Sequence, residues 1–292
     1  MGDKAGSGRR EPGRGRREAG SHTAEALGYT DSTVAHDFVR LSDAADEEDG
    51  ALLASEVPVA LVYNGRPHAV MMCTPSDLED FAYGFTATEQ IAASADIRRV
   101  DVVRYSKGIE LQIEIPADAA EKLPGRGRAI TGRTGCGLCG VEAIDEALRE
   151  PRIVRSALVV TRDALWRASA SLGSQQPLNN ETNAIHAAAW ASADGTLRVV
   201  REDVGRHNAL DKVLGALTRG ALDPAQGFLV VTSRASYELV QKASAANVPL
   251  LAAVSRPTAL AVELADQAGV TLVGLLRGRT ANVYTHVARI AS

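Results

Sequence analysis

The sequence predicts a layered α/β fold accompanied by a smaller β-rich subdomain on its N-terminal side. In the second half of the chain, short apolar segments alternate with amphipathic ones, which is typical of strands and helices that share a sheet. The first half instead carries short apolar runs separated by turn signals. The chain has 292 residues, of which 45% are hydrophobic and 4% aromatic, so aliphatic side chains and alanine must fill a sizeable core.

The β-rich part begins with a predicted hairpin. Apolar residues alternate within 56–63, Asn64-Gly65 is a strong turn signal, and residues 69–72 supply the returning strand. The polar segment at 74–77, with its proline, then predicts the start of a helix. Residues 97–115 hold two more strand candidates on either side of a Lys-Gly turn.

The α/β part follows from residue 157 onward. Strands are expected at 157–160, 197–201, 228–231, 250–254 and 271–275, and helices at 163–172, 208–217, 236–246 and 257–268. This alternation favours parallel neighbouring strands.

We therefore divide the chain into three parts. Residues 1–30 form a basic tail that is too polar to offset its ordering entropy and is expected to be disordered. Residues 31–127 form the β-rich subdomain, in which the acidic segment 43–50 is expected to be a loop. Residues 128–292 form the α/β domain.

Composition excludes several classes of protein. The formal net charge of −4 gives no general electrostatic reason to bind nucleic acid or an acidic membrane. No apolar stretch is long enough to span a bilayer, and the N-terminus lacks the apolar core of a secretory signal. The 3 cysteines do not suggest a disulfide framework, so we expect a cytoplasmic protein with reduced thiols.

The segment Arg-Thr-Gly-Cys-Gly-Leu-Cys-Gly at 133–140 is the most informative local feature. Its glycines add no side-chain bulk around Cys136 and Cys139, which predicts an exposed and adaptable loop. Nearby arginines favour the thiolate over the thiol, and the thiolate is the form that attacks a sulfur donor. Spacing alone also allows half of a zinc site or a dithiol–disulfide pair. The remaining Cys73, beside two methionines, is expected to be a core residue.

A dense polar cluster at 201–212 follows a predicted strand and opens a helix. Ligands bind at the carboxyl ends of strands in open α/β sheets, and a helix N-terminus attracts anions. Arg206 and His207 are therefore candidate ligand contacts, with Asp203 or Asn208 as a helix cap. The alternative is a charged surface turn stabilised by pairing of His207 with the residue four positions later, Asp211.

Similar hydroxyl and arginine side chains follow the next strands. Ser233 and Arg234 lie after one strand, residues 255–258 after the next, and Arg277 and Arg279 after the last. Together they predict a phosphate-bearing ligand, and a guanine nucleotide would suit such an edge. His186 precedes an alanine-rich run, where both a core role and a functional role stay open.

These segments, in this order, resemble the formate dehydrogenase accessory sulfurtransferase family, commonly called FdhD. The resemblance covers about residues 55–287, and the Gly-Cys-Gly-x-Cys-Gly and Arg-Glu-Asp-Val-Gly-Arg-His segments are specific in combination. The matching segments are residues 56–65, 78–82, 133–140, 201–212, 233–238, 260–265 and 283–285.

The resemblance implies a sulfurtransferase that carries a persulfide on Cys136, with Cys139 assisting. The sulfur would come from a cysteine desulfurase and pass to the molybdenum bis(molybdopterin guanine dinucleotide) cofactor of formate dehydrogenase, which is an acceptor rather than a permanently bound group. It also implies a homodimer and an α/β domain that resembles the cytidine deaminase fold. The family's cofactor-binding stretch matches Leu275, Leu276, Arg277, Gly278, Arg279 and Thr280.

Two other hypotheses stay open from the residues. The protein could be a cofactor chaperone that needs no sulfur transfer, or a dithiol redox protein that uses Cys136 and Cys139. Deamination is not expected, because zinc deaminases need a His-x-Glu segment followed by a Cys-x-x-Cys pair. Here His186 is followed by alanines, and the cysteine pair lies upstream.

Overall fold

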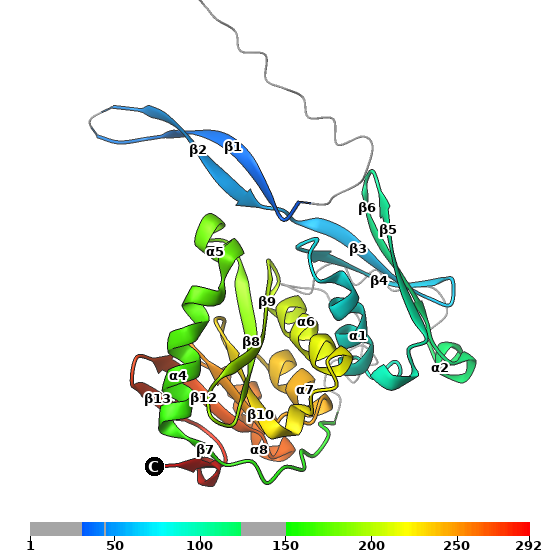
Figure 1. Cartoon of the computed structure of the whole chain (residues 1–292), viewed down its shortest axis with the longest axis vertical. Coiled ribbons are helices and arrows are strands. Elements are labelled where there is room, and N and C mark those ends of the chain that lie inside the picture. The colour runs from blue at the N-terminus through cyan, green and yellow to red at the C-terminus, as the bar shows by residue number, and fades with distance from the viewer. Residues whose placement is uncertain (1–30, 44, 124–149) are drawn as a thin grey trace, which may run out of the picture.

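The apolar segments of the second half of the chain form a six-stranded sheet in the order β13-β12-β11-β10-β8-β9 (Figure 1). The computed structural model describes residues 31–43, 45–123 and 150–292. As expected, β10, β11 and β12 run parallel, whereas β8, β9 and β13 run antiparallel to their neighbours. The strands are β8 (His186–Ser192), β9 (Leu197–Asp203), β10 (Gly227–Val231), β11 (Leu250–Ala253), β12 (Thr271–Arg277) and β13 (Thr280–Val283).

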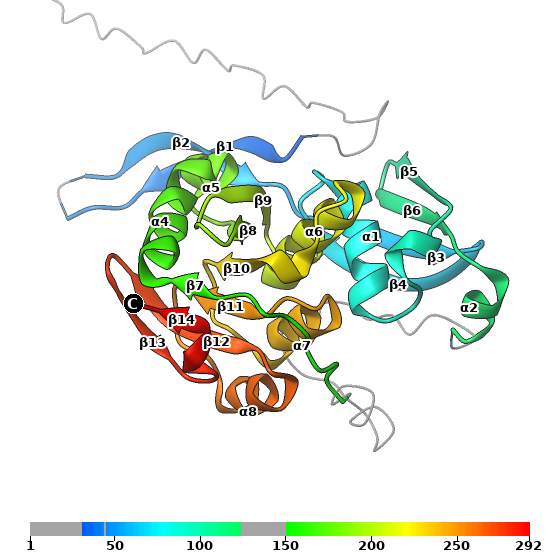
Figure 2. The ribbon, with the colours of Figure 1, turned by 60° about the horizontal axis from the view of Figure 1, so that its bottom comes forward.

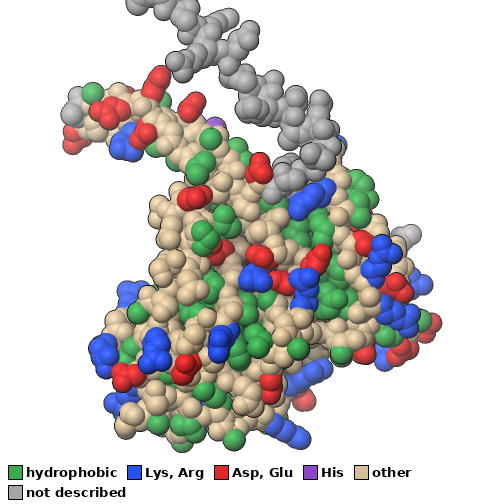
Figure 3. Space-filling model, in the orientation of Figure 1, with side chains coloured by type: hydrophobic (Ala, Val, Ile, Leu, Met, Phe, Trp, Pro, Cys, Tyr) green, Lys and Arg blue, Asp and Glu red, His purple; other side chains and the backbone are tan. Residues whose placement is uncertain are grey.

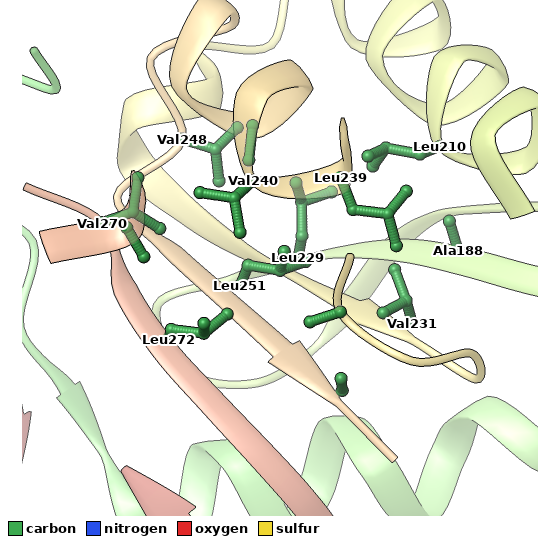
Figure 4. Packing of buried hydrophobic residues seen from close by; sticks show 14 of the residues in the cluster. Ala188, Leu210, Leu229, Val231, Leu239, Val240, Val248, Leu251, Val270 and Leu272 are labelled. Carbon is green, nitrogen blue, oxygen red and sulfur yellow. The ribbon is translucent and has the colours of Figure 1, made fainter. Parts of the chain in front are cut away.

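Helices cover both faces of this sheet (Figures 1 and 2). One face carries α6 (Arg206–Arg219), α7 (Tyr237–Ala245) and α8 (Ala259–Ala268), and the other carries α4 (Arg162–Leu172). Side chains alternate along each strand, so Leu229 of β10 packs toward α7 while Phe228 packs toward α4. Figure 4 shows Leu229 and Leu251 facing Leu239 and Val240 of α7.

Most of the expected α/β elements are confirmed, with three differences. The strand expected at 157–160 is reduced to β7 (Val160–Thr161), which pairs with β14 (Ile290–Ala291). β13 and β8 were not expected. β8 is rich in alanine, which is uncommon in strands, and only its burial between β10 and β9 makes it one.

The first half forms a four-stranded sheet in the order β4-β3-β6-β5. The expected hairpin is confirmed, and both Asn64 and Gly65 adopt the positive φ that its tight turn requires. The apolar face of the sheet packs on the expected helix α1, although the residue before α1, Asp77, does not cap it through its side chain. The elements are β3 (Val57–Tyr63), β4 (Arg66–Cys73), α1 (Leu78–Thr88), β5 (Arg99–Tyr105), β6 (Gly108–Glu114) and α2 (Ala117–Glu121).

The two sheets are joined by a close crossing of α1 and α6. A Cβ added to Gly84 of α1 would lie 1.8 Å from the carbonyl oxygen of Asp211, and one added to Gly215 of α6 would lie 1.8 Å from that of Asp80. Each helix therefore has a glycine at the point of closest approach, because any side chain there would overlap the backbone of the other helix. The crossing places the N-terminal end of α6 against the segment that follows β4.

A two-stranded ribbon precedes these sheets. It consists of β1 (Thr33–Arg40) and β2 (Glu47–Ala54), which are antiparallel and paired along their full length. The expectation of a loop at residues 43–50 was therefore wrong for its second half, because residues 47–50 lie in β2. Acidic residues and glycine have low strand propensity, but pairing with β1 outweighs that low propensity here.

The division of the chain at residues 30 and 127 stays a prediction, as does the resemblance of the α/β domain to cytidine deaminase. Within the described residues, no helix is long and apolar enough to cross a membrane. Short 3₁₀ turns lie at Ser94–Asp96, Gly173–Gln175, Pro224–Gln226 and Val287–Arg289, and a short helix, α5 (Pro177–Thr182), precedes β8.

Candidate functional site

One edge of the six-stranded sheet collects most of the predicted site residues. The carboxyl ends of β10, β11 and β12 lie at this edge because these strands are parallel. The start of β8 and the end of β9 lie there too, since His186 is paired with Asp203. Helices α6, α7 and α8 each begin just after a strand ends at this edge, so their positive N-terminal ends meet there. We call it the site edge.

His207 lies in the first turn of α6 and contacts α7. Its Nε2 lies 2.7 Å from Oε2 of Glu238 and 3.4 Å from Oγ of Ser236. The pairing of His207 with Asp211 that a simple surface turn would make is not present, because Asp211 instead pairs with Lys242 of α7. The sequence did not single out Glu238, since one acidic residue in the first turn of a helix is ordinary.

Arg206 is half-buried beside His207, and its Nε is buried without a hydrogen-bond partner among the described residues. Burial lowers the pKa of Arg206, and the neighbouring Arg234 lowers it further, while Glu238 opposes them. Two guanidinium groups held close together with a buried unpaired donor favour an anionic ligand. Arg234 is exposed, whereas the adjacent Ser233 is buried and donates its Oγ to the Arg234 carbonyl oxygen at 3.0 Å.

His186 belongs to the same edge. Burial lowers the pKa of His186, and electrostatic interactions with Arg206 and His207 lower it further. The half-buried imidazole is therefore held in its neutral form among cations. The chain reaches it through α5, whose first two amides donate to the Glu202 carboxylate. Only the order of the strands in the sheet brings His186 beside α6, which the sequence could not show.

The stretch that the resemblance assigned to cofactor binding forms the end of β12 and its turn into β13. Leu276 is fully buried in the core toward α4. Leu275 adopts a left-handed backbone, with φ 54°, at a bulge, and Arg277 donates its Nε to the Val254 carbonyl oxygen. Thr280 donates to the Arg277 carbonyl oxygen across the turn at Gly278.

Arg279 points elsewhere. Its guanidinium pairs with Asp163 of α4 at 2.7 Å, and both side chains are largely exposed. Among the arginines of this turn, Arg277 is the one tied to the neighbouring strand end at the site edge.

Most of the polar side chains in the cluster at 201–212 are internal. Asp203 and Lys212 form a fully buried ion pair at 2.7 Å, and Asp203 also accepts from the backbone amides of Thr74 and Gly205. Asn208 donates to Asp203 and to the Met72 carbonyl oxygen, so neither polar residue caps α6. These side chains join the two sheets, and Arg206 and His207 are the members that face the site edge.

The predicted sulfur carriers, Cys136 and Cys139, lie outside the described residues, so their roles stay predictions. Cys73 is a core residue, as expected. Burial raises the pKa of its thiol, and the nearby Asp203 carboxylate raises it further, which makes Cys73 a poor nucleophile. No cluster of His, Cys, Asp and Glu that could hold a metal ion is present in the part of the chain that the structure describes.

Comparisons with known proteins agree with this architecture. A crystal structure described as that of a formate dehydrogenase accessory protein from Desulfotalea psychrophila has the same fold, with a TM-score of 0.72. It is 23% identical, and the match covers 89% of this chain and 100% of that one.

Close relatives in sequence are proteins named sulfur carrier protein FdhD. The one from Xanthomonas campestris pv. campestris (strain B100) is 54% identical over 240 residues, which cover 82% of this chain and 85% of the relative. The one from Bordetella petrii is 49% identical over 239 residues, which cover 82% and 86%. The model of the FdhD/NarQ family matches residues 54–291, and the chain belongs to this family.

Proposed function

We propose that this protein is a sulfur carrier that takes persulfide sulfur from a cysteine desulfurase and delivers it to the molybdenum bis(molybdopterin guanine dinucleotide) cofactor of formate dehydrogenase. The observation that carries the proposal is the Gly-Cys-Gly-x-Cys-Gly motif in a chain about half identical to proteins named sulfur carriers. We further propose that the protein acts in the cytoplasm as a homodimer.

The site edge supports the second half of the proposal. The acceptor carries several phosphate groups, and Arg206, Arg234 and His207 lie together at the N-terminal ends of α6 and α7. The unpaired Nε of Arg206 offers a donor for one phosphate oxygen. Arg277, at the end of β12 and two strands away from β10, is the proposed contact for a second group of the same ligand.

The sulfur steps balance as thiol chemistry. The Cys136 thiolate attacks the outer sulfur of the desulfurase persulfide, and the desulfurase cysteine leaves as a thiolate. In delivery, the sulfur–sulfur bond breaks, the outer sulfur bonds to the acceptor, and Cys136 returns to a thiolate. Because sulfane sulfur becomes sulfide, the acceptor supplies two electrons. Cys139, three residues after Cys136, is the proposed assistant in this transfer.

Intact mass spectrometry tests the loading step. The purified chain, incubated with a cysteine desulfurase and cysteine, should gain the mass of one sulfur atom and lose it on reduction. Cys136→Ala should abolish the gain, whereas Cys73→Ala should keep it because Cys73 is buried in the core.

An absence of any gain with an active desulfurase would favour the cofactor-chaperone hypothesis, in which the site edge binds and delivers the cofactor without carrying sulfur. A reversible disulfide between Cys136 and Cys139, with thiol exchange activity, would instead favour a redox protein. Full sulfur loading in Cys139→Ala would contradict that redox role.

A further inference from the structure

The β1–β2 ribbon contacts α5 through β2, yet it leaves much of its apolar surface exposed. Its large apolar side chains are well exposed: Val34 57%, Phe38 37%, Val39 55%, Leu52 38% and Leu53 48%. An isolated two-stranded ribbon is only marginally stable in water. Clustered exposed apolar side chains mark a surface that binds a partner.

The pairing register places apolar side chains on both faces of the ribbon. Val34 is paired with Leu53, and Ala35 with Leu52. Because successive side chains point to opposite faces, Val34, Phe38 and Leu53 share one face, and Leu52 and Val39 share the other. A partner must therefore wrap around the ribbon or receive it in a groove.

The far end of the ribbon is acidic. Asp43, Asp46, Glu47 and Glu48 are exposed around the turn, and none of them forms an ion pair within the described residues. Asp49 is paired with Arg40, which leaves a clear excess of negative charge. Figure 3 shows acidic side chains gathered over this end of the ribbon. The partner should present positive charge there.

The same chain carries such a surface at its site edge. Arg234 and Arg256 follow neighbouring strands, are exposed, and form no ion pair with any described residue. Figures 1 and 2 show the ribbon's far end projecting beyond the rest of the described chain, so it does not reach its own site edge. A second copy of the chain can supply the edge that the ribbon does not reach in its own chain.

We propose that the ribbon of one copy packs on a second copy and places its acidic end at that copy's Arg234 and Arg256. Each protomer then contributes carboxylates to the edge of its partner's site. The acidic end competes there with an anionic ligand, so ligand binding and assembly are coupled. The inference concerns assembly and holds whether or not the protein carries sulfur.

Charge reversal in the full-length chain tests this contact by size-exclusion chromatography with light scattering. The wild-type chain should be a dimer. Glu47→Arg/Glu48→Arg and Arg234→Glu/Arg256→Glu should each raise the dimer dissociation constant by about tenfold or more. A mixture of the two variants should restore dimers, since each ribbon then meets an edge of opposite charge. The control Asp118→Arg/Glu121→Arg, on exposed α2, should leave the dimer unchanged.

Three outcomes would overturn the proposal. In the first, both reversed variants stay fully dimeric. In the second, they become monomers and their mixture forms no dimer. In the third, the wild-type chain is a monomer, and its ribbon amides lose hydrogen-exchange protection when residues 1–30 are removed. That result would mean that the chain's own basic tail, and not a second copy, covers the apolar surface of the ribbon.

Discussion

Arg206 combines partial burial, a like-charged neighbour and an unpaired donor. Its guanidinium is kept near Arg234 at the cost of repulsion that a bound anion would relieve. The apolar packing of α6 begins at Ala209, one turn after Arg206, so the core cluster does not account for an arginine at this position. We therefore propose that Arg206 contacts an anionic ligand.

Guanosine diphosphate is a simple probe of this site. Arg206→Gln should weaken its binding by about tenfold or more, because a hydrogen bond to a charged group contributes about 1.5–3 kcal/mol. Arg234→Gln should act in the same direction, and Arg162→Gln on the exposed start of α4 is the matched control. Isothermal titration calorimetry measures all three. Equal affinity in the wild type and Arg206→Gln would remove Arg206 from the site.

His186 should report on the same charges. Burial and then Arg206 and His207 lower its pKa from 6.5, so Arg206→Gln should raise that pKa toward 6.5. Because the folded-state pKa is lowered, the unfolded chain binds the extra proton first, and stability should fall as the pH drops below about 6.5. The NMR titration of the imidazole in both forms measures the shift. An unchanged pKa in Arg206→Gln would place the two residues too far apart to interact.

The crossing of α1 and α6 is decided by two glycines. A Cβ at Gly84 or Gly215 would overlap a backbone carbonyl of the opposing helix, which cannot move as a flexible side chain can. Gly84→Ala or Gly215→Ala should therefore lower the free energy of unfolding by at least about 1–3 kcal/mol, although alanine favours a helix. Gly173→Ala, where a Cβ meets nothing within 4 Å, should be nearly neutral. Urea unfolding compares them, and a neutral Gly84→Ala would mean that the helices can separate freely.

Elements with a strong local pattern could be predicted, and those that depend on tertiary contacts could not. The hairpin around Asn64 and the parallel strands of the α/β part follow from turn chemistry and apolar periodicity. β8 has no β-branched residue and forms because β10 and β9 pair with it, whereas the two ribbon strands have no regular apolar alternation and form by pairing with each other. The sequence therefore predicted the central parallel strands of the six-stranded sheet, but not β8 or β13.

The candidate site shows the same limit. Strand ends followed by arginines predicted the site edge, because parallel strands must present those ends together. The sequence could not separate the internal charges of residues 201–212 from the outward ones. Asp203 accepts a hydrogen bond from the amide of Thr74, which lies 129 residues away in the sequence. Only the folded structure therefore shows which of these charged side chains are occupied by internal contacts.

At the scale of the whole molecule, the buried charges link the two sheets into one unit. Lys212 donates to Asp203 and to the Thr74 carbonyl oxygen, so one ammonium group holds the end of β9 and the segment after β4. Lys242 and Asp211 form a second buried ion pair. The Thr88 hydroxyl at the end of α1 donates to Asp211, and Lys242 also donates to the Glu89 carboxylate. Replacing one member of such a pair leaves an uncompensated charge in the interior.

Lys212→Met should therefore lower the free energy of unfolding by about 3–5 kcal/mol, because Asp203 loses its counter-charge while fully buried. Hydrogen exchange should rise in both sheets, since the lost contacts join them. Lys122→Met, at an exposed site on the first sheet's side, should change stability by no more than about 0.5 kcal/mol. The double variant Asp203→Asn/Lys212→Met should lose less than the sum of its single variants, because neither charge remains. If exchange rose in the six-stranded sheet alone, the ion pair would support that sheet without coupling it to the other, and the α1–α6 crossing would have to carry the connection by itself.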